Sequence, residues 1–310
     1  MYSLPNSLRI GVLRGGPSPK YSDSLQNGSF ILENLSETHR PVDIFISSDG
    51  KWHVQGMERS PERILKNIDV VWNGLEGPFG EDGCVQGILD NVGALYTGSG
   101  KLESAICMNR HMIKERAQAL GIKTPVSLLV RETDSLSEKA KEIWNSIPNP
   151  LVVKPAKGGY SLYYKKVSSY RDLLSALEEV LAGHDSALVE EYISGKLTNS
   201  SVLEDFRGKE FYTFPAIEIS GMLPIYPTSF SEATNKEMEI ASRLIHKNLG
   251  LRHYSSSDFI VSPRRGVYLL EVSTSPKLGE KSSILKSLES VGVSVKDFLH
   301  HTIGLALNKK

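Results

Sequence analysis

The sequence has few of the features that mark secreted, membrane-spanning or nucleic-acid-binding proteins. Cysteine occurs only twice in 310 residues, at Cys84 and Cys107, and no partner motif accompanies either one. We therefore expect two buried small side chains, and neither a disulfide nor a metal pair. No apolar run is long enough to span a bilayer, and the first residues lack the charged start and apolar core of a signal peptide. We expect a cytoplasmic protein with no membrane partner.

Net charge is also absent, because 36 acidic residues balance 36 basic ones. Without a net positive field we expect no nucleic-acid partner, and any phosphate binding must be local. Internal repeats and low-complexity tracts are missing as well. The length suits two or three folded domains.

The first hundred residues alternate short apolar runs with helical patterns. Leu8–Leu13 runs into a glycine turn, and Ser24–Leu35 then has a helical pattern. This is the opening of a βαβ unit, in which ligands collect at the carboxyl ends of strands. Further strands are expected at Val42–Ile46, Val70–Trp72 and Ala94–Tyr96, and a helix at Val85–Asn91. The pattern predicts an open, mainly parallel sheet.

A glycine-rich acidic loop, Asn73–Gly83, follows one of these strands. Its four glycines and one proline surround Glu76, Glu81 and Asp82. Glycines allow such a backbone to pass close to a ligand. The alternative is a turn whose acids favour the N-terminus of the next helix.

The segment Leu151–Val167 has the pattern of a strand, a small-residue loop and a second strand. Its glycines allow backbone N–H groups to approach phosphate oxygens, and Lys154 supplies a positive charge beside them. The alternative is a hairpin with a solvated basic turn. Before this segment, Leu102–Leu120 has the spacing of one helix, on which Arg110 is either a solvated charge or a phosphate contact.

Two later segments place carboxylates on strands. Ala187–Ile193 offers Glu190 and Glu191, which is typical of the edge of an adenosine site or of an edge strand protected by charges. Next, a predicted hairpin brings Asp258 and Glu271 together. Two buried carboxylates are relieved most simply by a cation such as Mg²⁺.

The C-terminal stretch Ile284–Leu307 has an amphipathic pattern. We expect it to form one helix that closes the last domain.

Together these segments resemble the D-alanine–D-alanine ligase family of the ATP-grasp superfamily, over nearly the whole chain. The resemblance rests on GPFGEDG with a following QG, YTGSG, VKPA before the lid glycines, VEEYISG, and DF with YLLEV and TSP. It implies an α/β (α+β) three-domain ATP-grasp fold. The implied domains are an N-terminal Rossmann-like parallel-sheet domain (1–101), a central ATP-grasp subdomain (102–186) and a C-terminal ATP-grasp subdomain (187–310).

The resemblance also implies cofactors and residue roles. ATP and Mg²⁺ (or Mn²⁺) are the implied cofactors. The implied catalytic residues are Lys154, Ser161 and Arg110, and the implied ATP-binding residues are Arg110, Lys154, Glu190, Glu191 and Ile193. Substrate positions fall on Glu81, Tyr160 and Ser282, and metal positions on Asp258, Glu271 and Ser273.

Several positions depart from the family's pattern. Ser22 and Ser256 stand where the family uses a glutamate for the substrate ammonium and an arginine for the oxyanion, unless Arg252 or His253 replaces the arginine. Other replaced positions are Glu76 (histidine), Tyr160 (serine), Leu197 (ribose glutamate), Ser273 (asparagine) and Lys277 (glycine). Losing one oxyanion donor costs about 3–4 kcal/mol of transition-state stabilisation. We therefore expect an altered substrate or reduced activity.

The implied function is ATP-dependent ligation of a carboxylate to an amine through an acyl phosphate, as in peptidoglycan biosynthesis. D-alanine, a related small amino acid or another small carboxylate is the expected substrate, and a homodimer is expected. Two alternatives stay open. One is a catalytically silent nucleotide-binding homologue, and the other is a kinase-like or cyclising activity on a different acid.

Overall fold

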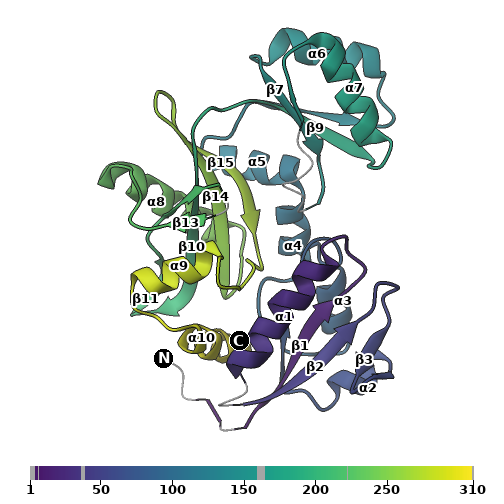
Figure 1. Ribbon diagram of the computed structural model, residues 1–310, viewed down its shortest axis with the longest axis vertical. Coiled ribbons are helices and arrows are strands. Elements are labelled where there is room, and N and C mark those ends of the chain that lie inside the picture. Colours follow the sequence, from purple (N-terminus) through teal and green to yellow (C-terminus); the bar gives the residue numbers. More distant parts are fainter. Residues whose placement is uncertain (1–3, 6, 36–38, 159–164, 222, 309–310) are drawn as a thin grey trace.

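The computed structural model describes residues 4–5, 7–35, 39–158, 165–221 and 223–308. Within them the strands form three sheets, each with its own helices (Figure 1). The sheets follow one another along the chain, and the C-terminal helix returns to the first. No described helix has the length and apolar character needed to cross a bilayer.

The N-terminal sheet has the strand order β4-β3-β2-β1-β5 among the described residues. Its members are β1 (Arg9–Gly15), β2 (Arg40–Ile46), β3 (Trp52–Val54), β4 (Met57–Glu58) and β5 (Val70–Asn73), with helices α1 (Tyr21–Leu35), α2 (Pro61–Leu65) and α3 (Cys84–Asn91). β1 pairs in parallel with both neighbours, and β3 and β4 add an antiparallel edge. The predicted strand at Ala94–Tyr96 is wrong, because this segment makes only one bridge, from Val71 to Tyr96.

The prediction for the cysteines is half right. Cys107 is buried, whereas Cys84 is exposed at the first position of α3. Both are free thiols, as expected from their lack of partner motifs.

The predicted single helix over Leu102–Leu120 is in fact two helices, α4 (Lys101–Met108) and α5 (Arg110–Ala119). Asn109 adopts extended backbone angles between them, and its side chain accepts hydrogen bonds from the backbone N–H groups of His111 and Met112. Asparagine competes with helical hydrogen bonding in this way and favours helix starts. The break places Arg110 at the first turn of α5.

The central sheet has the order β6-β9-β7-β8 among the described residues. It comprises β6 (Ser127–Arg131), β7 (Leu151–Pro155), β8 (Lys165–Val167) and β9 (Ser186–Glu191), covered by α6 (Leu136–Ser146) and α7 (Tyr170–Leu181). β9 lies between β6 and β7, so the alternative reading of its acids as guards of an edge strand is wrong. This sheet extends past residue 186, and the domain boundaries themselves stay a prediction.

The C-terminal sheet is built on long antiparallel strands. It comprises β10 (Lys196–Phe206), β11 (Lys209–Thr213), β12 (Ile217–Ser220), β13 (Leu223–Ile225), β14 (Tyr254–Ser262) and β15 (Gly266–Ser273), with α8 (Glu232–Asn248) packed on it. The predicted hairpin is confirmed, and Asp258 stands opposite Glu271 in the β14–β15 register.

The predicted helix over Ile284–Leu307 is also two helices, α9 (Ser283–Ser290) and α10 (Val295–Leu307). Gly292 has a φ of +69° between them, and Ser294 caps α10 by accepting from the backbone N–H of Asp297. A left-handed glycine and a serine cap end one helix and start the next.

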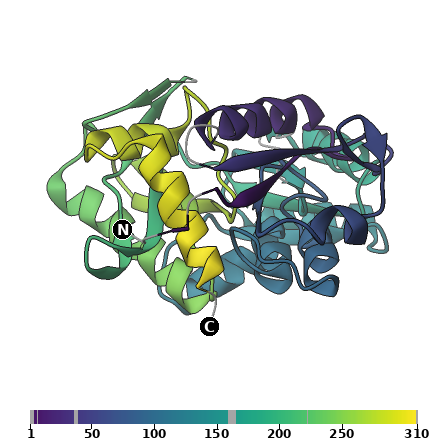
Figure 2. The ribbon, with the colours of Figure 1, turned by 90° about the horizontal axis from the view of Figure 1, so that it is seen from below.

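Helix α10 closes the molecule by packing against the N-terminal domain, beside α1 and β5 (Figure 2). Its Phe298 is fully buried and makes edge-to-face contacts with Trp72 of β5 and Tyr254 of β14. One aromatic cluster therefore joins the N-terminal sheet, the C-terminal sheet and the last helix.

Replacing Phe298 with alanine should lower the free energy of unfolding by about 3–5 kcal/mol, because a buried aromatic side chain is lost and a cavity remains. Chemical denaturation of the wild type and F298A measures the difference. The exposed Leu102 gives a control, L102A, which should change stability by less than about 0.5 kcal/mol. Equal stability of F298A and wild type would contradict this packing.

Candidate active site

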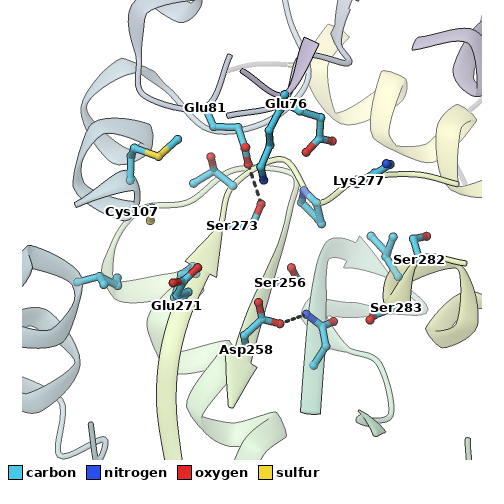
Figure 3. A pocket seen from close by; sticks show the side chains of 18 of the residues that line it. Glu76, Glu81, Cys107, Ser256, Asp258, Glu271, Ser273, Lys277, Ser282 and Ser283 are labelled. Carbon is cyan, nitrogen blue, oxygen red and sulfur yellow. Dashed lines mark hydrogen bonds between the residues drawn. The ribbon is translucent and has the colours of Figure 1, made fainter. Parts of the chain in front are cut away.

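Two cavities meet between the sheets, and both are lined by Asp258, Glu271 and Ile219. The first has a volume of about 350 Å³ and opens toward the acidic loop and α9. The second has a volume of about 430 Å³ and lies between β7, β9 and the C-terminal sheet. In Figure 3, Glu76 and Glu81 lie at one end of the first cavity, and Asp258 and Glu271 lie at the other.

The second cavity has mainly apolar walls. Ile193 packs with Ile260, Tyr268 and Leu270 to form a small cluster, and the remaining apolar wall residues are Pro125, Val152, Leu197 and Ile219. Lys154, Glu190 and Glu191 are the charged groups on its central-domain side. An apolar slot with a few polar groups suits a flat, heteroatom-bearing ring.

The carboxylate of Glu190 lies between two buried lysines. One of its oxygens is ion-paired with Lys154, and the other lies 2.7 Å from the ammonium of Lys114. Burial alone would raise the pKa of Glu190, but Lys154 and Lys114 overcome this effect and hold the pKa at about 2. The side chain of Glu190, which we expect to bind ATP, is therefore already engaged by two cations.

The neighbouring Glu191 is also engaged. Its carboxylate accepts two hydrogen bonds from Arg265, at 2.7 and 3.1 Å, and one from the backbone N–H of Val126. This ties the turn after β14 to the end of β9. In the described structure the side chain of Glu191 is a tie between the two sheets that form the second cavity.

Arg110 lines the first cavity and holds Glu271, which lines both. Its Nε donates to Glu271 at 2.6 Å, and its Nη1 donates to the carbonyl of Pro155 at 3.0 Å, at the end of β7. Its Nη2 is buried and has no hydrogen-bond partner among the described residues. A buried guanidinium with one unused donor is suited to a phosphate oxygen.

One of the two hairpin carboxylates, that of Asp258, is bound by a residue that the sequence analysis did not single out. Asn199 on β10 stands opposite Asp258, and its amide donates to the Asp258 carboxylate at 2.7 Å. Burial raises the pKa of Asp258 to about 6, with the charge of Glu271 as a further cause. For Glu271 burial acts in the same direction, but Arg110 and Lys154 lower its pKa.

These groups fit a hard divalent cation. Asp258 and Glu271 offer carboxylate oxygens, which are ligands that Mg²⁺ prefers, and the amide N–H of Asn199 holds the Asp258 carboxylate in place. A cation would also relieve the two facing carboxylates. No cluster of three or more histidine, cysteine, aspartate or glutamate side chains able to hold a metal occurs in the described part of the chain, so phosphate oxygens or water would complete the shell.

Ser273 connects the end of β15 to the acidic loop. Its hydroxyl donates to Glu81 at 3.1 Å, and the other Glu81 oxygen accepts from the backbone N–H of Gly77 at 2.6 Å. Burial raises the pKa of Glu81. Ser273 thus positions Glu81, while its predicted role as a metal ligand stays untested.

The acidic loop is held against α1. Asn27 of α1 donates to Glu76 at 3.0 Å, and the hydroxyl of Ser24 accepts from the backbone N–H of Glu76 at 2.7 Å. Burial is the main cause that raises the pKa of Glu76, and the charge of Glu81 adds to it. The loop therefore brings two carboxyl groups to one end of the first cavity, which favours the ligand-binding reading of the loop.

Neither Arg252 nor His253 lines either cavity. The guanidinium of Arg252 lies over the ring of Tyr96 and donates to its hydroxyl at 3.3 Å, and His253 accepts from the backbone N–H of Gly98. Replacement of the family's arginine by one of these two residues, which the sequence left open, therefore has no support in the lining of the two cavities. Four basic residues line the first cavity together with Ser256, namely Lys20, Arg110, Lys277 and Lys281.

The remaining expected residues divide into two groups. Ser282 lines the first cavity at the start of α9 and accepts from the backbone N–H of Leu285 as the helix cap. Tyr160 and Ser161 lie outside the described residues. The residues missed by the sequence analysis are Lys20, Asn199 and the paired role of Lys114. For Asn199 a signal was available. The alternation of side chains along β10 places Asn199 on the same face of the sheet as Asp258, its partner on β14.

Replacing Glu190 with glutamine should lower the free energy of unfolding by about 3 kcal/mol at pH 7, because two buried ammonium groups lose their counter-charge. In the wild type the contribution of Glu190 is fully present above its ordinary pKa of 4.5 and is lost as the pH falls toward 2. The wild-type advantage over E190Q should therefore shrink across that range in denaturation curves. Glu142 is exposed and ion-paired with Lys139, so E142Q is a control. It should lower the free energy of unfolding by less than about 1 kcal/mol. A difference that does not depend on pH would contradict the pairing.

Known proteins that are similar to this chain are ligases. The family described as "D-ala D-ala ligase C-terminus" matches residues 117–304. The D-alanine–D-alanine ligase of Fervidobacterium nodosum is 33% identical over 322 residues, covering 97% of this chain and 99% of that protein. That of Geobacter sulfurreducens is 32% identical over 311 residues, covering 95% and 93%.

Two solved structures extend the comparison to the fold. The D-alanine–D-alanine ligase from Bacillus anthracis complexed with ATP superposes with a TM-score of 0.80 at 27% identity, covering 97% of each chain. The VanG D-Ala:D-Ser ligase from Enterococcus faecalis gives a TM-score of 0.86 at 26% identity, covering 97% of this chain and 99% of that one. The resemblance and the fold class expected from the sequence are confirmed: this chain belongs to the D-alanine–D-alanine ligase family of ATP-grasp ligases.

Proposed function

We propose that this protein joins two small amino acids, with D-alanine as the first choice, by ATP-dependent ligation through an acyl phosphate. The observation that carries the proposal is the pair of cavities that share Asp258 and Glu271. One cavity suits a nucleotide base and the other a small zwitterion, and the carboxylate pair lies at their junction. That is where a phosphoryl group must pass between the two ligands.

The nucleotide side is assigned as follows. The apolar slot beside Ile193 takes the adenine ring, and Arg110 and Lys154 contact the phosphates, for which the unused Nη2 of Arg110 is one ready donor. The ammonium of Lys154 is ion-paired with Glu190. It would move from Glu190 to the phosphates when ATP binds. Glu191 holds the walls of the slot together.

The metal side rests on Asp258 and Glu271, with Asn199 and Ser273 beside them. Mg²⁺ (or Mn²⁺) bound there would neutralise phosphate charge during transfer. The hydrogen bond from Asn199 fixes the Asp258 carboxylate, and the ion pair with Arg110 fixes Glu271. The protein thereby holds both carboxylates in place before a ligand binds.

The substrate side rests on the acidic loop and α9. Glu81 is proposed to face the ammonium of an amino acid, and Ser282, at the N-terminus of α9, to face a carboxylate. Tyr160 and Ser161 lie outside the described residues and stay predictions as substrate and catalytic residues. A homodimer and a cytoplasmic location also stay predictions. The ligase names of the relatives favour turnover over silent nucleotide binding.

The direct test is ADP release by the purified protein in Mg·ATP, with and without D-alanine. We expect D-alanine to stimulate release, and L-alanine serves as the stereochemical control. Lys154→Met should lower kcat roughly a hundred- to a thousandfold, because the ammonium that would stabilise the phosphoryl group during its transfer is removed. The exposed Lys157, paired with Asp185, gives the control K157M, which should keep wild-type rates. No ADP release with any amino acid would overturn the proposed function.

Replacing Asp258 with asparagine separates the metal role from a structural one. We expect D258N to lose Mg²⁺-dependent turnover while the metal-free protein becomes more stable, since one of two facing carboxylates loses its charge. Turnover as a function of Mg²⁺ concentration and thermal unfolding in EDTA measure the two effects. Unchanged Mg²⁺ dependence would show that the metal lies elsewhere.

A further inference from the structure

The first cavity contains a lysine that the proposed function has not yet used. Lys20 immediately precedes α1 and lines this cavity together with Glu76, Glu81 and Asp258. It is half-buried, and no hydrogen bond or ion pair engages its ammonium within the described residues. The other basic residues around the cavity differ. Arg110 is bound to Glu271, Lys277 is bound to Asp23 at 2.5 Å, and Lys281 is exposed.

Local packing fixes the course of the Lys20 side chain. Ser18 accepts a hydrogen bond from the backbone N–H of Lys20 at 3.1 Å. The stem of Lys20 then lies over Gly77, where an added Cβ would come within 3.4 Å of Cδ and 2.8 Å of the Ser18 hydroxyl. Gly77 also has a φ of +74°, which disfavours any larger residue. The acidic loop therefore contains a glycine where the lysine stem passes.

The charge of Lys20 reaches both ends of the cavity. Burial raises the pKa of Glu76, Glu81 and Asp258, and Lys20 is the cation that opposes this rise at all three. Lys20 shares one cavity with the acidic loop and with the carboxylate pair of the hairpin. A reacting carboxyl group would occupy the same region, because it must meet both the amine and the phosphate.

We propose that Lys20 is a catalytic residue, whose ammonium binds the reacting carboxyl group of the first amino acid and stabilises the oxyanion formed during ligation. The inference rests on the proposed function and adds Lys20 to the residues that carry out the ligation. Ser256 on β14, which lines the same cavity, carries no charge for this purpose. The positive charge is supplied from the N-terminal domain instead.

The chemistry balances with Lys20 keeping its protons throughout. The carboxylate oxygen attacks the γ-phosphorus, and the bond to the ADP oxygen breaks. The ammonium group of the second amino acid gives one proton to a carboxylate of the cavity, and the lone pair that this frees forms the C–N bond while the carbonyl electron pair moves onto oxygen. Collapse breaks the C–O bond to phosphate, which leaves with a second proton from the nitrogen, and the amide keeps the third. The Lys20 ammonium donates a hydrogen bond to the oxygen that carries the transient negative charge.

The test compares Lys20→Met with Lys20→Arg and with the double variant K20M/S256R. Lys20→Met should lower the kcat of D-alanine-dependent ADP release at least a hundredfold, and Lys20→Arg should stay within about tenfold of wild type. Arginine at 256 should restore at least tenfold in the K20M background, because it returns a cation to the same cavity. Lys286→Met, a half-buried lysine outside the cavity paired with Glu289, should match wild type.

The readouts distinguish a catalytic from a merely structural lysine. The thermal shift caused by Mg·ATP should be the same in wild type and K20M, which shows that the variant folds and binds nucleotide. If Lys20 only balanced Glu76, then adding Glu76→Gln to K20M would restore the rate and the arginine at 256 would not. That result, or a K20M enzyme with wild-type kcat and KM, would overturn the proposal.

Failure of the proposed function is recognised separately. If wild type releases no ADP with any amino acid, calorimetric titration of D-alanine in the presence of Mg²⁺ and the β,γ-imido analogue of ATP decides the role of Lys20. Binding that is lost in K20M and kept in K286M would support carboxylate recognition by Lys20. Equal binding in both, or none in the wild type, would refute it.

Discussion

The structure depends on a set of buried ion pairs at the junction of the central and C-terminal sheets. Lys154 and Lys114 share Glu190, and Arg110 holds Glu271 while donating to the end of β7. Each charge is expensive to bury alone and is tolerated because its partner comes from a different element. The pairs thus align the two sheets before any ligand binds. They also keep the cations available for phosphate, since an ion pair can exchange one anion for another.

The elements on the opposite side of the site are held together by a different kind of interaction. There the acidic loop, α1 and the end of β15 are joined by hydrogen bonds rather than by complete ion pairs, through Asn27, Ser24 and Ser273. Burial leaves Glu76 and Glu81 with raised pKa values, so these carboxyls are suited to exchanging protons with an amine. The proposed assignment of Lys20 explains how such an acidic pocket can still receive a carboxylate. It also explains why serine is tolerated at Ser256.

Much of the fold could be predicted because local signals agreed with one another. The Asp258–Glu271 pairing followed from two strand patterns around one turn, and the parallel start of the sheet followed from a strand, glycine turn and helix. Two predicted helices were each divided in two where a single capping residue overrode periodicity, as Asn109 and Ser294 did. Contacts between residues far apart in the sequence could not be predicted either. No sequence pattern indicates that Phe298 packs on Trp72, or that Lys20 crosses Gly77 to reach a cavity built by three distant segments.

Replacement of family residues was visible from the sequence, but compensation for it was not, because compensation depends on which side chains share a cavity. The proposed function requires that this altered cavity still completes the ligation of two amino acids. The most direct measurement is the stoichiometry of products formed from D-alanine and Mg·ATP, by mass spectrometry and phosphate assay. We expect ADP, inorganic phosphate and a dipeptide in equal amounts. Release of ADP and phosphate without a dipeptide, or no product at all, would contradict it.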